Sequence, residues 1–247
     1  AGGTLCLPPP NASHDPAALT ACLERLRITA ADLPPSLLPH LALAQLPTHL
    51  RTVVIGGEVC DPAVARRWAQ RVRLINVYGP TEATVCTSLG RVDPDTWSAP
   101  LLGQPLPGTT YRVLGPDLRP TMVGELYIGG EGLALGYLNQ PRLTARRFLE
   151  IEGERLFATG DRVRRRPDGE WVFEGRIDRQ LKVSGRLVAP EEIESVLLAH
   201  PEVTAAAALP GPSGELVGVV ETGGDLDGVR AYAAARLPAW MVPHRLV

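Results

Sequence analysis

Residues 72–82 read Val-Arg-Leu-Ile-Asn-Val-Tyr-Gly-Pro-Thr-Glu, an apolar run that ends in a sharp turn with polar side chains. We predict a buried strand over Val72–Val77, because a short apolar run before Gly-Pro is typical of one. Another apolar run, Leu50–Ile55, precedes it, and Asp61-Pro62 predicts a helix that begins there and continues to about Arg71. Strand, helix and strand joined by short turns favour parallel pairing and an α/β layer.

Outward from this stretch the pattern changes twice. Upstream, apolar spacing predicts a helix over Pro16–Leu26 with Asp15 as its N-cap. From about residue 101, short strands alternate with Gly, Pro and Asp turns, which predicts an antiparallel region. Its expected strands are Tyr111–Leu114, Glu125–Ile128 and Glu170–Phe173, with Pro167-Asp168-Gly169 as a hairpin turn. Later come an expected helix, Pro190–Leu198, two strands, Thr204–Leu209 and Glu215–Glu221, and a last helix, about Asp227–Arg236.

These changes predict a mixed α/β fold in two parts with a boundary near Asp178. Residues 1–177 would form an α/β layer to about residue 100 and an antiparallel β region over about 101–177. Residues 178–247 would form a smaller α+β part. The chain begins without methionine, so we expect a fragment of a longer protein.

Composition excludes several function classes. Hydrophobic residues make up 45% and charged residues 21% of the 247 residues, with a formal net charge of −2, so neither a nucleic-acid nor a membrane surface is expected. The one dense basic run, Arg162–Arg166, is best explained as a solvated strand edge before a turn. The four cysteines lack metal-ligand spacing and no signal peptide is present, which favours a reduced, cytoplasmic protein.

The polar end of the opening stretch suits a phosphate-bearing ligand. Ligands of open α/β sheets bind at the carboxyl ends of strands, where this loop is expected. The Thr81 hydroxyl can bond a phosphate oxygen, the Glu82 carboxylate can hold a magnesium ion that bridges phosphates, and Tyr78 offers a flat face for a base. A plain turn with an N-capping threonine is the simpler alternative.

Two later segments carry polar residues of the same kind. Thr159-Gly160-Asp161 is expected to follow a short strand, Arg155–Ala158, where a carboxylate can accept both ribose hydroxyls. Alone, this tripeptide is a common turn. Downstream, Arg176 is a planar donor for ribose or phosphate, and Asp178 lies where a hinge is expected. The alternative for both is a charged, solvated linker.

A glycine-rich stretch, Gly124–Leu138, superficially suggests dinucleotide binding. We exclude this reading because Leu135 occupies the place of the third glycine of G-x-G-x-x-G and Pro141 blocks the helix that should follow. These glycines are instead expected to permit tight backbone crossings.

Together these segments resemble the adenylate-forming family, and specifically the adenylation domains of nonribosomal peptide synthetases. Five stretches are similar to the fifth to ninth core motifs of that family, in the same order: Asn76–Glu82, Gly124–Gly130, Ala158–Asp161, Gly175–Glu194 and Leu237–Pro243. The resemblance implies a two-step ligase that uses ATP and Mg²⁺. An amino acid becomes an aminoacyl-adenylate and then passes to the phosphopantetheine thiol of a carrier domain.

The resemblance also assigns roles. It implies nucleotide binding by Asn76, Tyr78, Gly79, Thr81, Asp161 and Arg176, catalysis by Thr81 and Glu82, magnesium binding by Glu82, and a hinge at Asp178. It implies a substrate pocket at Asp32, Val54, Gly56, Val77, Val85 and Cys86. Only Asp32 in this pocket is charged, which favours a polar or basic amino acid, since a buried carboxylate needs a partner. The alternative is that Asp32 caps the following helix or lies outside the pocket.

Several family features are absent or altered, so this chain alone is expected to be inactive. The lysine-bearing phosphate loop, the aspartate for the substrate amine and the terminal lysine motif are missing. Leu135, Ser184, Leu187 and Ala189 replace charged residues of the sixth and eighth motifs. Two alternatives therefore stay open, a degenerate non-catalytic module and an acyl- or aryl-CoA ligase. Expected partners are the amino acid, a peptidyl carrier domain and neighbouring synthetase domains. A small activator protein stays open.

Overall fold

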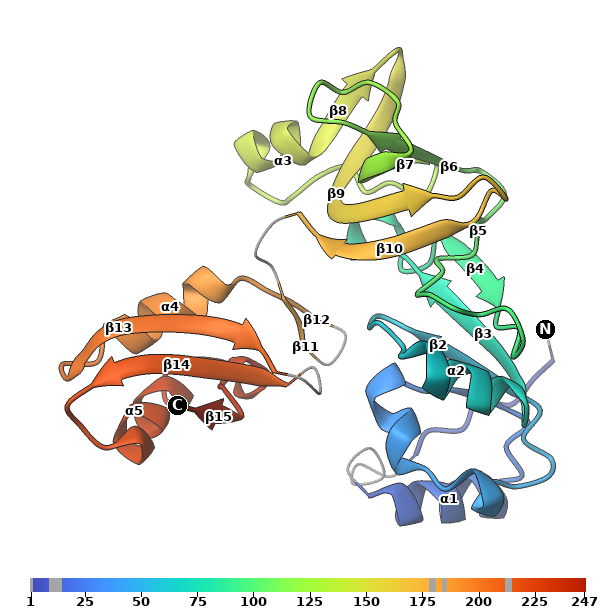
Figure 1. Cartoon of the computed structure of the whole chain (residues 1–247), viewed down its shortest axis with the longest axis horizontal. Helices are drawn as coiled ribbons and strands as arrows, with labels where there is room; N and C mark the ends of the chain where they lie inside the picture. The colour runs from blue at the N-terminus through green and yellow to red at the C-terminus, as the bar shows by residue number, and fades with distance from the viewer. Residues whose placement is uncertain (1, 9–14, 178–180, 184–185, 212–214) are drawn as a thin grey trace. The chain divides into compact units, whose positions relative to one another are not determined.

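The computed structural model describes residues 2–8, 15–177, 181–183, 186–211 and 215–247 (Figure 1). The chain divides into two compact units, Ala1–Ile177 and Asp178–Val247. The first unit carries two sheets and the second a smaller α+β arrangement. In the described part of the chain, no helix is long and apolar enough to cross a membrane.

The first sheet of unit 1 has the order β1-β2-β3-β4-β5. Its strands are β1 (Ala30–Asp32), β2 (Thr52–Gly56), β3 (Arg73–Tyr78), β4 (Ser88–Arg91) and β5 (Gln104–Pro105). The parallel pairing predicted for the opening stretch is confirmed, because β1, β2 and β3 are parallel, whereas β4 and β5 add antiparallel strands at one edge. Short 3-10 helices connect the strands: η1 (Pro35–His40), η2 (Leu43–Gln45) and η3 (Thr81–Ala83).

The two predicted helices of this layer, α1 (Pro16–Arg25) and α2 (Pro62–Ala69), begin at the expected caps. The Asp15 and Asp61 carboxylates each accept hydrogen bonds from two backbone N–H groups of the first turn, which satisfies donors that a helix start leaves free. From α2, Trp68 is fully buried in a core shared with apolar side chains of β2 and β3. That core uses one face of each strand, since side chains alternate along a strand.

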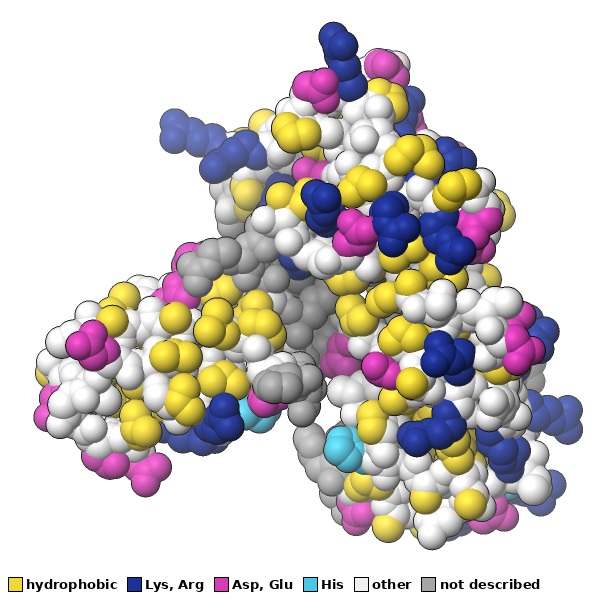
Figure 2. All heavy atoms as spheres, viewed as in Figure 1, with side chains coloured by type: hydrophobic (Ala, Val, Ile, Leu, Met, Phe, Trp, Pro, Cys, Tyr) yellow, Lys and Arg dark blue, Asp and Glu magenta, His cyan; other side chains and the backbone are white. Residues whose placement is uncertain are grey.

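The second sheet of unit 1 has the order β10-β9-β7-β6, with β8 paired to β9. Its strands are β6 (Thr109–Leu114), β7 (Val123–Gly130), β8 (Phe148–Ile151), β9 (Glu154–Arg165) and β10 (Trp171–Arg176), all antiparallel as predicted. Gly124 confirms the expectation of tight crossings, because a Cβ there would lie 2.3 Å from the Leu114 carbonyl oxygen. Basic and acidic side chains lie over β9 and β10 (Figure 2), and Arg162 and Arg164 both pair with Glu174. The basic run is solvated as expected, but it is not a strand edge, because β9 lies between β10 and β7.

Two expectations for this sheet are wrong. Thr159-Gly160-Asp161 does not follow a strand that ends at residue 158, because β9 continues through it to Arg165 and pairs with both β7 and β10. Pro141 does not block a helix either. It begins α3 (Pro141–Arg147), because the first helical position needs no backbone N–H and suits the fixed φ of proline.

Unit 2 contains the predicted helices and strands with small shifts in their bounds. A hairpin of β11 (Leu181–Val183) and β12 (Arg186–Val188) precedes α4 (Pro190–Leu198), β13 (Val203–Pro210), β14 (Leu216–Thr222), α5 (Leu226–Ala234), η4 (Ala239–Met241) and β15 (Arg245–Leu246). The sheet order is β13-β14-β15, with β15 parallel to β14. Ile193 and Leu197 of α4 and Val229 of α5 are fully buried in its core.

Candidate functional site

The loop after β3 has the sharp turn that its Gly-Pro sequence predicts. A Cβ at Gly79 would lie 2.6 Å from the Val85 carbonyl oxygen, so only glycine fits where this loop folds back. Thr84 and Val85 both have left-handed backbone, with φ of 59° and 67°. This conformation is unfavourable for a β-branched residue and is often found at functional sites.

Tyr78 and Asp161 bring the two sheets of unit 1 together. Tyr78 closes β3, and its hydroxyl donates a hydrogen bond to Asp161 Oδ2 in the middle of β9. Arg176, at the end of β10, donates from Nη1 to Asp161 Oδ1 over 2.8 Å. Only 2% of Asp161 is exposed, so this carboxylate is held between a phenol and a guanidinium inside the unit. Three residues predicted for the nucleotide site therefore meet at one point.

Burial sets the acid–base behaviour of this cluster. Desolvation, and next the neighbouring Asp161 charge, raise the pKa of Tyr78 well above its ordinary value, so its hydroxyl stays a hydrogen-bond donor. Tyr111 packs edge-on to Tyr78 with ring centroids 6.5 Å apart, and desolvation raises the pKa of Tyr111 to about 12. The sequence analysis did not single out Tyr111, because nothing except its position in an expected strand distinguishes it.

Glu82 lies at the start of the same loop and has a partner that the sequence did not suggest. Tyr137, which follows the glycine-rich strand β7, donates from its hydroxyl to Glu82 Oε1 over 2.5 Å. The Glu82 side chain is partly buried, whereas Thr81 beside it is exposed. Tyr137 lies 55 positions from Glu82, so only its place in the glycine-rich stretch Gly124–Leu138 could have drawn attention to it.

The donor set around Glu82 decides what kind of metal it could hold. Within the residues described, no group of three His, Cys, Asp or Glu side chains could hold a metal ion. A single carboxylate suits magnesium that is bound chiefly by substrate phosphates and water, since this ion commonly takes one or two protein carboxylates in nucleotide sites. Glu82 therefore fits an ion that arrives with a nucleotide.

Four residues of the predicted substrate pocket lie on one face of the parallel sheet. Asp32 of β1 pairs in register with Val54 of β2, and Gly56 of β2 pairs with Val77 of β3. Paired residues two positions apart share a face. The Asp32 side chain is exposed and borders a cavity of about 710 Å³ between β1, α1 and residues 3–8.

The other pocket residues and the remaining nucleotide residue have distinct surroundings. Val85 is 78% exposed on the loop. The Cys86 thiol is half-buried and donates to the Ser88 carbonyl oxygen at 3.3 Å. Asn76 donates from Nδ2 to the Leu101 carbonyl oxygen at 2.8 Å, a contact that anchors the segment between β4 and β5.

The helix-capping alternative for Asp32 is wrong, because Pro34 is the N-cap residue of η1 and no side-chain hydrogen bond caps that helix. The predicted hinge, Asp178, and the altered Ser184 lie outside the described residues. Ala189 is the N-cap residue of α4 and contributes no side-chain cap.

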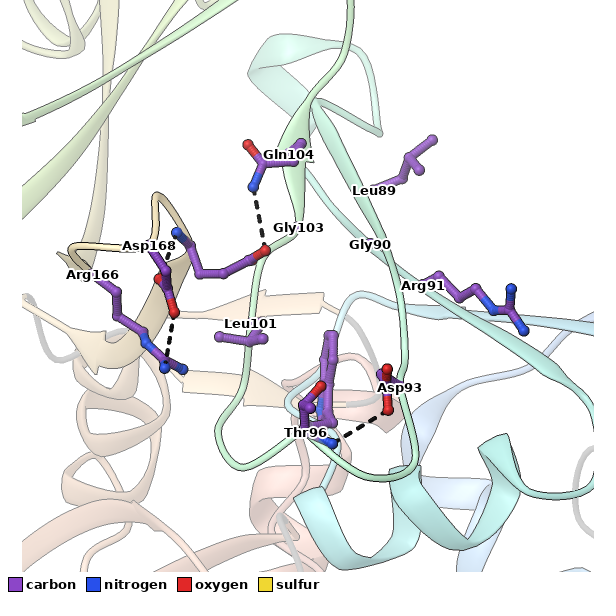
Figure 3. Close-up of a pocket in the computed structure, with 12 residues that line it drawn as sticks. Leu89, Gly90, Arg91, Asp93, Thr96, Leu101, Gly103, Gln104, Arg166 and Asp168 are labelled. Carbon is purple, nitrogen blue, oxygen red and sulfur yellow. Dashed lines mark hydrogen bonds and ion pairs between the residues drawn. The ribbon is translucent and has the colours of Figure 1, made fainter.

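A further cavity of about 550 Å³ lies between β4 and the turn that joins β9 to β10 (Figure 3). Leu89, Gly90 and Arg91 of β4 line one side, and the turn between β9 and β10 lines the other. On that turn Arg166 and Asp168 form an ion pair over 2.9 Å. None of the residues predicted for the site lines this cavity.

Comparison with known proteins decides the family. A profile of the family described as AMP-binding enzyme matches residues 1–138, more than half of the 247 residues. The chain belongs to the AMP-binding enzyme family. Novobiocin biosynthesis protein H of Streptomyces niveus is 39% identical over 98% of this chain and 42% of its own length. Phosphinothricin tripeptide synthetase PhsC of Streptomyces viridochromogenes is 40% identical over 98% of this chain and 24% of its own length.

A solved structure shows that the similarity also holds for the fold. An artificially fused adenylation–PCP di-domain NRPS from Klebsiella oxytoca is 28% identical, with a TM-score of 0.79 over 94% of this AMP-binding chain and 50% of that chain. The predicted resemblance to nonribosomal peptide synthetase adenylation domains and the mixed α/β fold are thus confirmed. The chain spans at most half the length of these three proteins.

Proposed function

We propose that this chain is part of an adenylation domain that activates an amino acid in a nonribosomal peptide synthetase. Residues 1–177 would be the C-terminal part of the large subdomain, and residues 178–247 the small subdomain up to a terminal lysine motif. In the first step a carboxylate oxygen of the amino acid attacks the α-phosphorus of ATP, and the bond to the β-phosphate breaks to release pyrophosphate. In the second step a phosphopantetheine thiol attacks the carbonyl carbon, and AMP leaves.

The observation that carries this proposal is the meeting of Tyr78, Asp161 and Arg176 beside the loop that holds Glu82. A carboxylate has about four lone-pair positions, so Asp161 can accept ribose hydroxyls in addition to its two protein donors once a nucleotide reaches it. Catalysis of acyl adenylation needs positioning and charge stabilisation, and the substrate carboxylate is already a nucleophile.

Within this site the chain supplies fixed donors and acceptors. The exposed Thr81 hydroxyl would donate to a phosphate oxygen, and Glu82 would hold a magnesium ion, which neutralises phosphate charge when bound. Arg176 holds Asp161 in place beside the ribose. By the same proposal Asn76, Tyr78 and Gly79 shape the base pocket, and Asp178 is the hinge for rotation of the small subdomain between the two steps.

The substrate is proposed to be a polar or basic amino acid. Asp32 is the only charged member of the proposed pocket, and its register partner Val54, together with Gly56 and Val77, presents an apolar or small surface on the same sheet face. The Asp32 carboxylate is exposed in this chain, so its pairing matters where a bound substrate excludes water from it. There a substrate ammonium, guanidinium or amide would pair with the carboxylate, whereas an aliphatic side chain would leave it unpaired.

Pyrophosphate exchange tests the proposal. The full-length protein that carries this chain should exchange labelled pyrophosphate into ATP with a polar or basic amino acid, and Asp161→Ala should raise the KM for ATP by roughly 10- to 100-fold. The 247-residue chain alone should not exchange. Preference for valine, leucine or phenylalanine over every polar amino acid would reject the Asp32 argument.

The same assay separates the alternative functions. Exchange with an aryl or fatty acid, and thioester formation on free coenzyme A, would identify an acyl- or aryl-CoA ligase. Absence of exchange with every acid would favour a non-catalytic module, which the altered eighth motif supports, since Ala189 offers no side-chain oxygen where that motif has a glutamate.

A further inference from the structure

The loop that follows β7 is hydrogen-bonded to the loop that follows β3. The Ala134 N–H donates to the Glu82 carbonyl oxygen at 2.8 Å, and the Thr84 hydroxyl donates to the Gly132 carbonyl oxygen at 2.7 Å. The Tyr137 hydroxyl reaches the Glu82 carboxylate from the same loop. Glu82 is therefore held through both its backbone and its side chain by residues about 50 positions downstream.

Tyr137 is itself fixed from two directions. Its backbone N–H donates to the Thr144 hydroxyl of α3 at 2.9 Å. Its ring packs edge-on against Phe148, with centroids 5.8 Å apart. These contacts restrain rotation of the Tyr137 side chain, so its hydroxyl stays hydrogen-bonded to one oxygen of Glu82.

Arg155 of β9 completes the support. Its Nη1 and Nη2 atoms donate to the carbonyl oxygens of Ala134 and Leu135, each at 2.9 Å, and its guanidinium lies 4.5 Å from the Phe148 ring centroid. The Leu135 side chain is 95% exposed, so the loop is held through its carbonyls and through Tyr137 and not by packing at this position.

We propose that Tyr137 is a positioning residue that orients the Glu82 carboxylate for a magnesium ion carried by ATP. The inference rests on the proposed function and adds a residue to the same site. Tyr137 engages Oε1, which leaves the second carboxylate oxygen for the ion. Hydrogen-bond partners of a metal-binding carboxylate fix its direction, and their removal typically lowers metal affinity about 10- to 100-fold.

The phenol is suited to this role over the whole physiological pH range. A tyrosine hydroxyl ordinarily loses its proton only near pH 10. The hydroxyl therefore stays protonated and can only donate to the carboxylate. A histidine in its place would change its charge near neutral pH.

A matched pair of tyrosines allows a direct test. Tyr127 also donates to a glutamate, Glu125 Oε2, at 3.2 Å, but it lies outside the proposed metal site. Tyr137→Phe and Tyr127→Phe remove the same chemical group. In the full-length protein, Mn²⁺ replaces Mg²⁺ as the probe, and its binding in the presence of a non-hydrolysable ATP analogue is followed by electron paramagnetic resonance.

We expect Tyr137→Phe to raise the Mn²⁺ dissociation constant about 10-fold and to raise the Mg²⁺ concentration for half-maximal pyrophosphate exchange by a similar factor. The KM for the amino acid should stay within about twofold. Tyr127→Phe should leave both metal readouts unchanged. In a Glu82→Gln background, Tyr137→Phe should have no further effect on Mn²⁺ binding, because the oriented group is gone.

The outcomes separate the two proposals. An unchanged Mn²⁺ dissociation constant in Tyr137→Phe, with Glu82→Gln still weakening it, overturns the role of Tyr137 and leaves the proposed function standing. A Glu82→Gln variant that binds Mn²⁺ as the wild type does overturns the metal assignment on which both rest. An equal effect of Tyr137→Phe and Tyr127→Phe shows general loosening of the sheet and also overturns the role of Tyr137.

Discussion

The loop after β3 and the middle of β9 carry the polar residues of one site in opposite ways. In the loop, Thr81 and Val85 are exposed, and two consecutive residues have left-handed backbone. In β9, Asp161 is buried beside a bulge, because Gly160 has a φ of 73° and the register with β7 shifts across Thr159–Asp161, and it has a protein donor on each carboxylate oxygen. The loop stores backbone strain and offers free surface, whereas the strand offers a fixed and desolvated charge.

This difference separates two ways of holding a functional group. A group in a loop depends on hydrogen bonds from other segments of the chain, as Glu82 depends on Tyr137. A group inside a sheet is placed by the register of its neighbours, as Asp161 is placed opposite Arg176 of β10. Substitutions should therefore affect stability strongly in the strand and weakly in the loop.

The largest expected effect is from Asp161→Ala. It leaves the Tyr78 hydroxyl and the Arg176 guanidinium without their common acceptor, and breaking a buried ion pair typically costs about 3–5 kcal/mol. Urea unfolding of the chain measures this loss. The exposed Thr81→Ala is the loop counterpart, and we expect a change within about 0.5 kcal/mol. Equal losses for the two variants would contradict the comparison.

An intermediate effect is expected from alkaline pH. The pKa of Tyr111 is about 12 in the folded chain and about 10 when unfolded, so its contribution is complete below pH 10 and is lost as the pH rises toward 12. The free energy of unfolding should fall by about 1.4 kcal/mol per pH unit in this window from Tyr111 alone. Unfolding measured from pH 8 to 11.5 tests this. Tyr111→Phe should make this fall in the free energy of unfolding less steep. An unchanged slope would show that Tyr111 does not cause the loss of stability at alkaline pH.

The smallest expected effect is a gain in stability from Val85→Gly. Glycine accepts the φ of 67° without the steric cost that a β-branched residue meets, and the exposed valine loses little packing, so we expect roughly 1 kcal/mol of stabilisation. Val59→Gly is the control, because Val59 is also exposed but does not have left-handed backbone. It should be destabilising by about 0.5–1 kcal/mol. Thermal unfolding of both variants measures the difference, and a loss of stability in Val85→Gly would show that this loop is not strained.

Many of the elements, among them α1, α2, α4 and α5, and the order of the motifs could be predicted from the sequence alone. Aspartate before proline marked the start of α2, alternation and turn residues marked the antiparallel strands, and the similarity of five segments marked the family. These signals are local, since capping, turn chemistry and periodicity depend on residues only a few positions apart.

Which residues meet depends on the tertiary fold. β9 runs through Thr159–Asp161 because it pairs with β7 both before and after the tripeptide and with β10 from Asp161 onward, whereas the tripeptide alone is typical of a turn. Tyr78 and Asp161 are 83 positions apart, and Glu82 and Tyr137 are 55 apart. Contacts over such separations depend on sheet register and loop packing, which bring distant side chains into hydrogen-bonding distance and leave no periodic trace in the chain.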